Sequence, residues 1–112
     1  MQLVLLGLNH KTAPVNVREA FSFSKEALEA ALDEFYNRPG VVECVILSTC
    51  NRREVYALIK ETEDPKAFML RALNEIKEIT LANEEYFYCK TDRDCLEHLC
   101  RVASSLDSLV VG

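Results

Sequence analysis

The chain has 112 residues, which is enough for one compact domain of about 100–150 residues and too few for two. Its composition is 49% hydrophobic and 28% charged with 3 Gly and 3 Pro, which excludes collagen-like and disordered chains. The 13 basic and 18 acidic residues give a net charge of −5, which disfavours a non-specific nucleic-acid binder held mainly by phosphate contacts.

Apolar runs and cysteines indicate the compartment. No apolar run approaches the roughly 18 residues of a membrane-spanning helix, and residues 1–8 lack the basic start of a secretory signal. We therefore expect a cytoplasmic chain with no membrane segment. The 5 Cys are an odd number without Cys-x-x-Cys spacing, so reduced thiols are expected rather than a disulfide framework or a zinc ribbon.

The first half of the chain predicts a strand, a helix and a hairpin. Leu3–Leu8 is apolar on both faces, which is typical of an interior strand. Ser24 is a good N-cap for a helix that the Pro-Gly pair at 39–40 ends. Its apolar stripe consists of Ala27, Leu28, Ala31, Leu32 and Phe35. Val41–Leu47 is almost wholly apolar and Glu54–Ile59 alternates, so these two segments predict a hairpin.

The second half predicts a helix, a strand and a last helix. Asp64 is a good N-cap and Pro65 suits a first helical position. Glu85–Cys89 predicts a short aromatic strand, and Asp92 begins the last helix. The stripe of that helix consists of Leu96, Leu99, Val102, Ala103, Leu106, Leu109 and Val110. The order of elements is the split βαβ pattern, so we expect an α+β, ferredoxin-like fold: a four-stranded antiparallel sheet packed by helices, with an extra C-terminal helix.

The hairpin connection at 48–52 contains no Gly, the residue usually found in such turns, and it carries Cys50. Arg52 and Arg53 are expected to favour the thiolate of Cys50 by lowering the pKa of the thiol from its free value of about 8.5. A thiolate is a nucleophile toward esters and carbonyls. The alternative is that Cys50 only ends a strand as a small apolar residue, and the sequence pattern leaves both interpretations open.

The other four cysteines are predicted to serve packing. Cys44 lies inside the second predicted strand, which we expect to be buried, Cys89 ends the aromatic strand, and Cys95 and Cys100 belong to the last helix. A metal site of Cys95, His98 and Cys100 fails on geometry, because Cys100 lies about 160° around the helix from His98. We therefore expect no bound metal.

A polar stripe runs along the last helix beside its apolar face. It consists of His98, Arg101, Ser105 and Ser108, at spacings of i, i+3, i+7 and i+10. Such a stripe can be a solvated flank or can line a cleft, and a His within reach of a nucleophilic Cys acts as its acid or base. His10, at the end of the first strand, is open to the same two interpretations.

Three runs of residues resemble the glutamyl-tRNA reductase family. The run 7–15, GLNHKTAPV, resembles the opening of these enzymes. The run 47–52, LSTCNR, with Glu54 and Tyr56 after it, resembles their active-site signature. Residues 98–112, which end in LDSLVVG, resemble the third block of the family, although the family often has Gly where Ser105 stands.

The resemblance implies a reaction and a set of site residues. Cys50 would attack the ester that joins glutamate to its tRNA, and NADPH would reduce the resulting thioester to glutamate 1-semialdehyde, which commits glutamate to 5-aminolevulinate and tetrapyrroles. His98 would serve the acid/base chemistry, and the guanidinium fork of Arg52 would bind the γ-carboxylate. The other residues that the resemblance places in the substrate pocket are Thr49, Asn51, Ser108, Asn9, His10 and Arg18.

The resemblance also implies parts that the chain lacks. Residues 1–112 would be the N-terminal catalytic domain, and NADPH binding and homodimerisation would belong to missing domains, since no Gly-rich dinucleotide fingerprint is present. The last helix is still apolar at Gly112, which agrees with a piece of a longer protein. The expected partners are glutamyl-tRNA and glutamate-1-semialdehyde aminomutase. A non-catalytic module that uses Arg52 and Arg53 to contact a nucleic acid or a regulatory protein remains the alternative.

Overall fold

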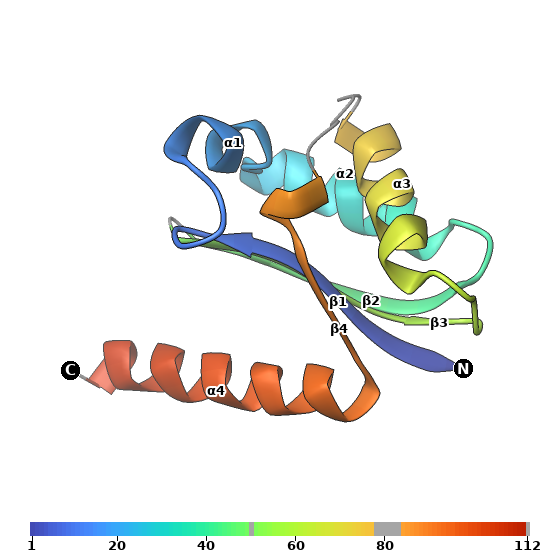
Figure 1. Cartoon of the computed structure of the whole chain (residues 1–112). Helices are drawn as coiled ribbons and strands as arrows, with labels where there is room; N and C mark the ends of the chain where they lie inside the picture. Colours follow the sequence, from blue (N-terminus) through green and yellow to red (C-terminus); the bar gives the residue numbers. More distant parts are fainter. Residues whose placement is uncertain (50, 78–83, 112) are drawn as a thin grey trace.

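The computed structural model of the chain describes residues 1–49, 51–77 and 84–111, with residues 105–111 described as helical backbone alone. The elements along the chain are β1 (Gln2–Asn9), α1 (Val15–Ala20), α2 (Lys25–Tyr36), β2 (Val41–Ser48), β3 (Arg52–Ile59), α3 (Pro65–Lys77), the 3₁₀ turn η1 (Glu84–Tyr86), β4 (Tyr88–Thr91) and α4 (Asp92–Val111). Three layers result, because α1, α2 and α3 lie on one face of the sheet and α4 lies on the other (Figure 1). No helix in the described part is long and apolar enough to cross a membrane.

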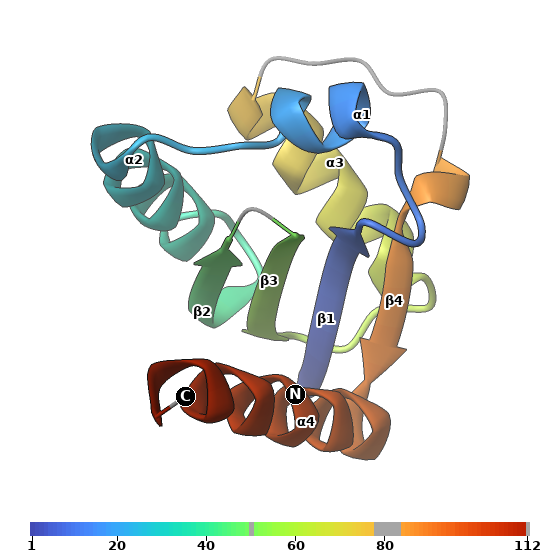
Figure 2. The same cartoon turned by 90° about the vertical axis from the view of Figure 1, so that its left-hand side faces the viewer.

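The sheet has the strand order β2-β3-β1-β4, and all neighbouring strands are antiparallel. Figure 2 shows the four strands side by side, with α4 crossing them. The strands β1 and β2, joined through α2, have β3 between them, which is the split βαβ arrangement. The predicted four-stranded α+β fold with an added C-terminal helix is therefore confirmed.

The central strand β1 supplies both faces of the core. Val4, Leu6 and Leu8 pack under the layer of three helices, whereas Leu5 packs with Tyr56 and Cys95 on the α4 side. Successive side chains of a strand point to opposite faces, so a strand that is buried on both faces must be apolar throughout. The interior position predicted for Leu3–Leu8 is confirmed.

Two predicted helix starts are also confirmed by their capping bonds. The Ser24 hydroxyl accepts a hydrogen bond from the amide of Ala27 at 3.1 Å. The Asp64 carboxylate accepts one from the amide of Ala67 at 3.0 Å. Each bond satisfies an amide that lacks a partner within its helix, which fixes where the helix begins.

The start of α4 sets the direction of that helix. No loop separates β4 from α4, and Asp92 turns the chain with a φ of +47°, a left-handed conformation that Asp tolerates better than most residues. Its carboxylate accepts a hydrogen bond from the amide of Leu3 at 3.1 Å. This contact holds the first turn of α4 against the end of β1.

Several boundary and burial predictions were wrong. The helix α1 was not expected, and the aromatic run begins as the 3₁₀ turn η1, so that β4 is Tyr88–Thr91 rather than Glu85–Cys89. The strand β2 lies at the edge of the sheet, and its Val45 is 62% exposed because α4 packs mainly over β1 and β4. Apolar composition alone does not distinguish an edge strand from an interior one.

The orientation of α4 also differs from the prediction. Cys95 and Val102 are buried, whereas Leu96 and Leu99, assigned to the inward stripe, are 52% and 38% exposed. His98 lies between Cys95 and Val102 on the buried side, at helical spacing. The sheet beneath His98 carries a polar group, so the helix presents a polar residue there.

Candidate functional site

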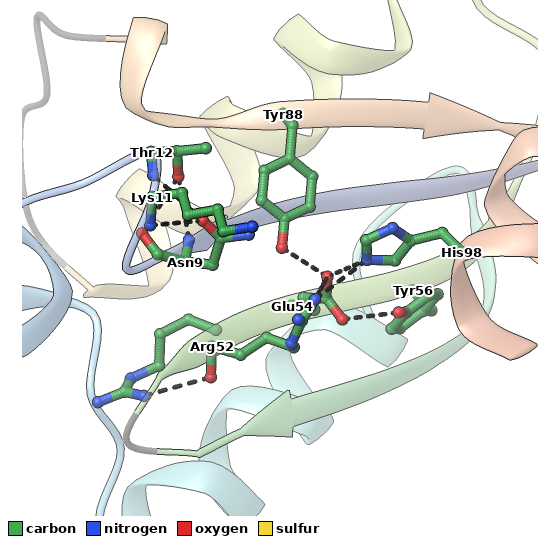
Figure 3. A network of polar contacts seen from close by, with 9 residues as sticks. Asn9, Lys11, Thr12, Arg52, Glu54, Tyr56, Tyr88 and His98 are labelled. Carbon is green, nitrogen blue, oxygen red and sulfur yellow. Dashed lines mark hydrogen bonds and ion pairs between the residues drawn. The ribbon is translucent and has the colours of Figure 1, made fainter. Parts of the chain in front are cut away.

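The centre of the candidate site is Glu54, a carboxylate on β3 with a side chain that is 0% exposed. Its Oε1 accepts a hydrogen bond from the Tyr56 hydroxyl at 2.7 Å, and its Oε2 accepts one from the Tyr88 hydroxyl at 2.5 Å. The same Oε2 lies 2.6 Å from Nε2 of His98 and 3.2 Å from Nη1 of Arg52. Figure 3 shows these four side chains converging on the carboxylate from β3, β4 and α4.

A glycine makes this convergence possible. Glu54, Gly7 and Tyr88 form one row across β3, β1 and β4 in the sheet register. Neighbouring strands are about 4.8 Å apart, so Tyr88 must pass over the strand between to reach a carboxylate two strands away. A Cβ on Gly7 would lie 2.9 Å from Cγ of Glu54 and from two ring atoms of Tyr88. Only glycine leaves room for the Tyr88 ring.

The electrostatics keep Glu54 ionised although it is buried. Burial is the largest single influence and raises the pKa of the carboxyl group, but hydrogen bonds from Tyr88, Tyr56 and His98 together bring the pKa below its usual value. Burial, and then the bond to Glu54, raise the pKa of both tyrosines, so they remain hydrogen-bond donors at neutral pH. The cluster thus places a fixed anion beside the Arg52 guanidinium.

The orientation of His98 follows from the same contacts. Nε2 is 2.6 Å from the Glu54 carboxylate and 3.3 Å from Nη1 of Arg52. A guanidinium only donates and a carboxylate only accepts, so the shorter contact assigns a proton to Nε2, which donates to Glu54. In the neutral ring, Nδ1 then carries the lone pair that can accept a proton. The acid/base role expected for His98 needs this lone pair and stays a prediction.

The hairpin turn brings the predicted motif to the end of β2 and β3. The amide of Thr49 donates to the carbonyl of Arg52 at 2.8 Å, and the reverse bond measures 3.4 Å. The carbonyl of Asn51, an exposed residue, accepts a hydrogen bond from the amide of His10 at 3.2 Å. The first loop of the chain therefore contacts the hairpin turn. Cys50 lies outside the described residues.

The remaining predicted pocket residues are distributed differently. Asn9 closes its own turn, because its side-chain oxygen accepts hydrogen bonds from the amides of Lys11 and Thr12 (Figure 3). His10 is exposed beside that turn. Arg18 lies on α1, which packs on the sheet face opposite α4. The side chain of Ser108 lies outside the described part. The structure thus brings Arg52 and His98 together and leaves Arg18 on another layer.

Glu54, Tyr56 and Tyr88 belong to the site although the sequence pattern predicts no role for them. A signal was present in β3, where an acidic residue stands two positions before a tyrosine and therefore on the same face of a largely apolar strand. Tyr88 gave no such signal, because its contact with Glu54 spans 34 positions in the chain. Among the described residues, no group of three His, Cys, Asp or Glu side chains is arranged to hold a metal ion.

We expect Gly7→Ala to disrupt the site strongly, although the substitution adds only one methyl group. The added methyl group forces Glu54 and Tyr88 apart, which should lower the free energy of unfolding by about 1–3 kcal/mol. Tyr88 should then ionise at lower pH, because the hydrogen bond that raises its pKa is weakened. Absorbance of phenolate during alkaline titration measures this. Gly40→Ala is the control, since Gly40 has a φ of +93° and lies near Phe68, away from the site. Equal titration curves for both variants would contradict the role of Gly7.

Cysteine labelling gives a second expectation. Burial is the main cause that raises the pKa of Cys44 and Cys89, and it raises that of Cys95 to about 11, so these three thiols should react slowly. Cys100 is exposed, so the prediction that it serves packing was wrong. We expect iodoacetamide to label Cys50 first, because only Cys50 has two arginines close by in the sequence. Peptide mapping that finds Cys100 labelled at least as fast would count against an activated Cys50.

Comparisons with known proteins agree with the three resembling runs. The family model described as "Glutamyl-tRNAGlu reductase, N-terminal domain" matches residues 6–112. A curated glutamyl-tRNA reductase from Thermodesulfovibrio yellowstonii is 44% identical over 125 aligned positions, which cover the whole of this chain and 28% of the relative. The chain therefore spans just over a quarter of the length of that relative. The chain belongs to the family of glutamyl-tRNA reductase N-terminal domains.

Proposed function

We propose that the chain is the catalytic domain of a reductase that converts glutamyl-tRNA to glutamate 1-semialdehyde. The observation that carries this proposal is the cluster of Arg52, His98 and buried Glu54, which lies where the hairpin bearing Cys50 meets α4. It offers a cation for an anionic substrate group and an imidazole for proton transfer. The family membership supports a glutamyl ester as the substrate.

In the proposed first step, Cys50 acts as the nucleophile. The thiolate sulfur attacks the carbonyl carbon of the glutamyl ester, the carbon–sulfur bond forms, and the carbon–oxygen bond to the ribose of the tRNA breaks. The leaving ribose oxygen takes up a proton, and the proposed source is Nδ1 of His98, which first accepts that proton from the Cys50 thiol. Glutamate is then held on the protein as a thioester, and the tRNA leaves.

Substrate recognition is proposed for the residues around this step. Arg52 would bind the γ-carboxylate with its guanidinium, and Thr49, Asn51 and Ser108 would contact the glutamyl group. Asn9 and His10 are proposed at the border of the pocket, since their turn contacts the hairpin. Arg18 is proposed there on the family resemblance, and its place on α1 favours a contact with the tRNA rather than with glutamate.

The reductant is proposed to be NADPH, bound outside these residues. The chain has 3 Gly in all, and the connection between β1 and α1 contains none, so the described residues do not form the glycine-rich turn that cradles a dinucleotide. We also propose that the protein forms a homodimer and has a cytoplasmic location. It would transfer the semialdehyde to an aminomutase for tetrapyrrole synthesis.

The proposal can be tested directly by incubating the protein with glutamyl-tRNA in the absence and in the presence of NADPH. With glutamyl-tRNA and no NADPH, we expect slow release of free glutamate, since water can discharge a thioester. With NADPH, the product should become glutamate 1-semialdehyde. A binding module would bind the tRNA and produce neither, and that result would remove the enzymatic proposal.

A further inference from the structure

Arg52 makes an unusually limited contact with the carboxylate beside it. Its Nη1 lies 3.2 Å from Oε2 of Glu54, the longest of the four contacts that this carboxylate receives. An arginine next to a carboxylate commonly forms two parallel hydrogen bonds, one to each oxygen. Of the two oxygens of Glu54, Arg52 reaches one in the described contacts, and its side chain stays 28% exposed.

The reason for this limited contact is that both oxygens of Glu54 already accept hydrogen bonds from other side chains. Tyr56 donates to Oε1 at 2.7 Å, and Tyr88 donates to Oε2 at 2.5 Å. His98 shares Oε2 with Tyr88 at 2.6 Å. An ionised carboxylate has about two acceptor sites on each oxygen, so Oε2 has little capacity left for the guanidinium.

We propose that Tyr56 and Tyr88 are positioning residues that occupy the oxygens of Glu54 and thereby prevent Arg52 from closing a bidentate pair with it. The guanidinium stays oriented by Glu54 but keeps its charge for an anionic group of the substrate. This inference rests on the proposed function, in which that group is the γ-carboxylate of the glutamyl ester.

The side chains around Glu54 support these separate roles of the two tyrosines and of Arg52. The groups that face Glu54 are Arg52 and Tyr56 from β3, Tyr88 from β4, and His98 with the nearby thiol of Cys95 from α4. Burial and the bond to Glu54 raise the pKa of both phenols, so they donate throughout the neutral range. Phenylalanine would fill the same space without donating, so the hydroxyl groups are the feature that occupies the carboxylate.

The test removes the hydroxyl groups and measures deacylation of glutamyl-tRNA without NADPH. In the double variant Tyr56→Phe/Tyr88→Phe, Arg52 should close on Glu54, and KM should rise about tenfold, the factor that one lost charge-assisted hydrogen bond implies. The value of kcat should change less, since Cys50 is untouched. Tyr86→Phe is the matched control, because Tyr86 packs against the core on the other face of the sheet.

A third substitution distinguishes two causes of a raised KM: pairing of the Arg52 charge with Glu54, and a loss of packing at the tyrosines. Adding Glu54→Gln to the double variant supplies a neutral amide that cannot hold the guanidinium as an anion does, so KM should fall again toward the wild-type value. A KM that stays high or rises further would overturn the proposal, because the tyrosines would then act only through packing.

The positioning role can also be tested without substrate, so that this test does not depend on the proposed function. Arginine side-chain NMR signals of the chain, assigned with Arg52→Lys, should show slower hydrogen exchange at Arg52 in the double tyrosine variant. Unchanged exchange would overturn the positioning role whatever the kinetics. Slower exchange with an unchanged KM would uphold the positioning role and instead contradict the assignment of Arg52 to the γ-carboxylate.

Discussion

Glu54→Ala is expected to lower the free energy of unfolding by about 3 kcal/mol, because removing one partner of a buried ion pair leaves the other groups without compensation. Arg52 loses its anion, and the hydroxyl groups of Tyr56 and Tyr88 lose their acceptor in a buried space. His98 also loses the contact that orients its ring. Urea unfolding followed by circular dichroism measures the change.

Glu43→Ala is the matched control for this experiment. Glu43 is an acidic residue of the sheet like Glu54, but it is exposed on the edge strand β2. Substitutions at such surface positions usually change stability by about 0.5 kcal/mol or less. If Glu54→Ala cost no more than Glu43→Ala, the cluster around Glu54 would not be a determinant of the fold.

The same carboxylate predicts an acid-dependent stability. Because the folded protein lowers the pKa of Glu54, ionised Glu54 stabilises the fold above its unfolded pKa of about 4.3. That contribution is lost as the pH falls from there through the lower folded value. Urea midpoints measured from pH 7 downward should therefore decrease more steeply in the wild type than in Glu54→Gln. Parallel curves would show that Glu54 does not titrate with a lowered pKa.

Cys50→Ala is expected to abolish the release of glutamate from glutamyl-tRNA in the absence of NADPH. Without a thiolate no thioester forms, so the rate should fall to that of spontaneous hydrolysis. Cys50→Ser should fall nearly as far, since a hydroxyl group is a weaker nucleophile at neutral pH. The rate of glutamate release, measured at low salt to favour tRNA binding, gives the result.

Cys100→Ala controls for the loss of a thiol as such. Cys100 is the exposed cysteine of α4, and no role in the site is assigned to it. Its variant should release glutamate at the wild-type rate. Equal rates for the wild type, Cys50→Ala and Cys50→Ser would make the binding-module interpretation the better one.

The fold followed from the sequence where local signals were strong. The caps at Ser24 and Asp64 and the two-sided apolar pattern of β1 led to the right elements and the right strand order. The exposure of β2 on the side of α4 and the rotation of α4 did not follow. Both depend on which strands α4 crosses, and that is decided by the turn at Asp92 and its bond to Leu3.

The candidate site could be predicted only in part for a similar reason. Arg52 and His98 were identified by their place in the resembling runs, and the structure brings them within 3.3 Å of each other. The link between them is Glu54, whose main donor, Tyr88, comes from a strand two positions away in the sheet. Such a contact requires the strand register and the space above Gly7, neither of which is a property of a local segment.

Trapping the glutamyl group on the protein tests whether Cys50 is the proposed nucleophile. The protein is mixed with glutamyl-tRNA without NADPH, quenched in acid within seconds, digested and mapped by mass spectrometry. If Cys50 is the nucleophile, the peptide that contains Cys50 should carry a glutamyl adduct, and hydroxylamine should remove the adduct because thioesters are labile to it. An adduct on another cysteine, or no adduct while glutamate is still released, would show that Cys50 does not carry the glutamyl group.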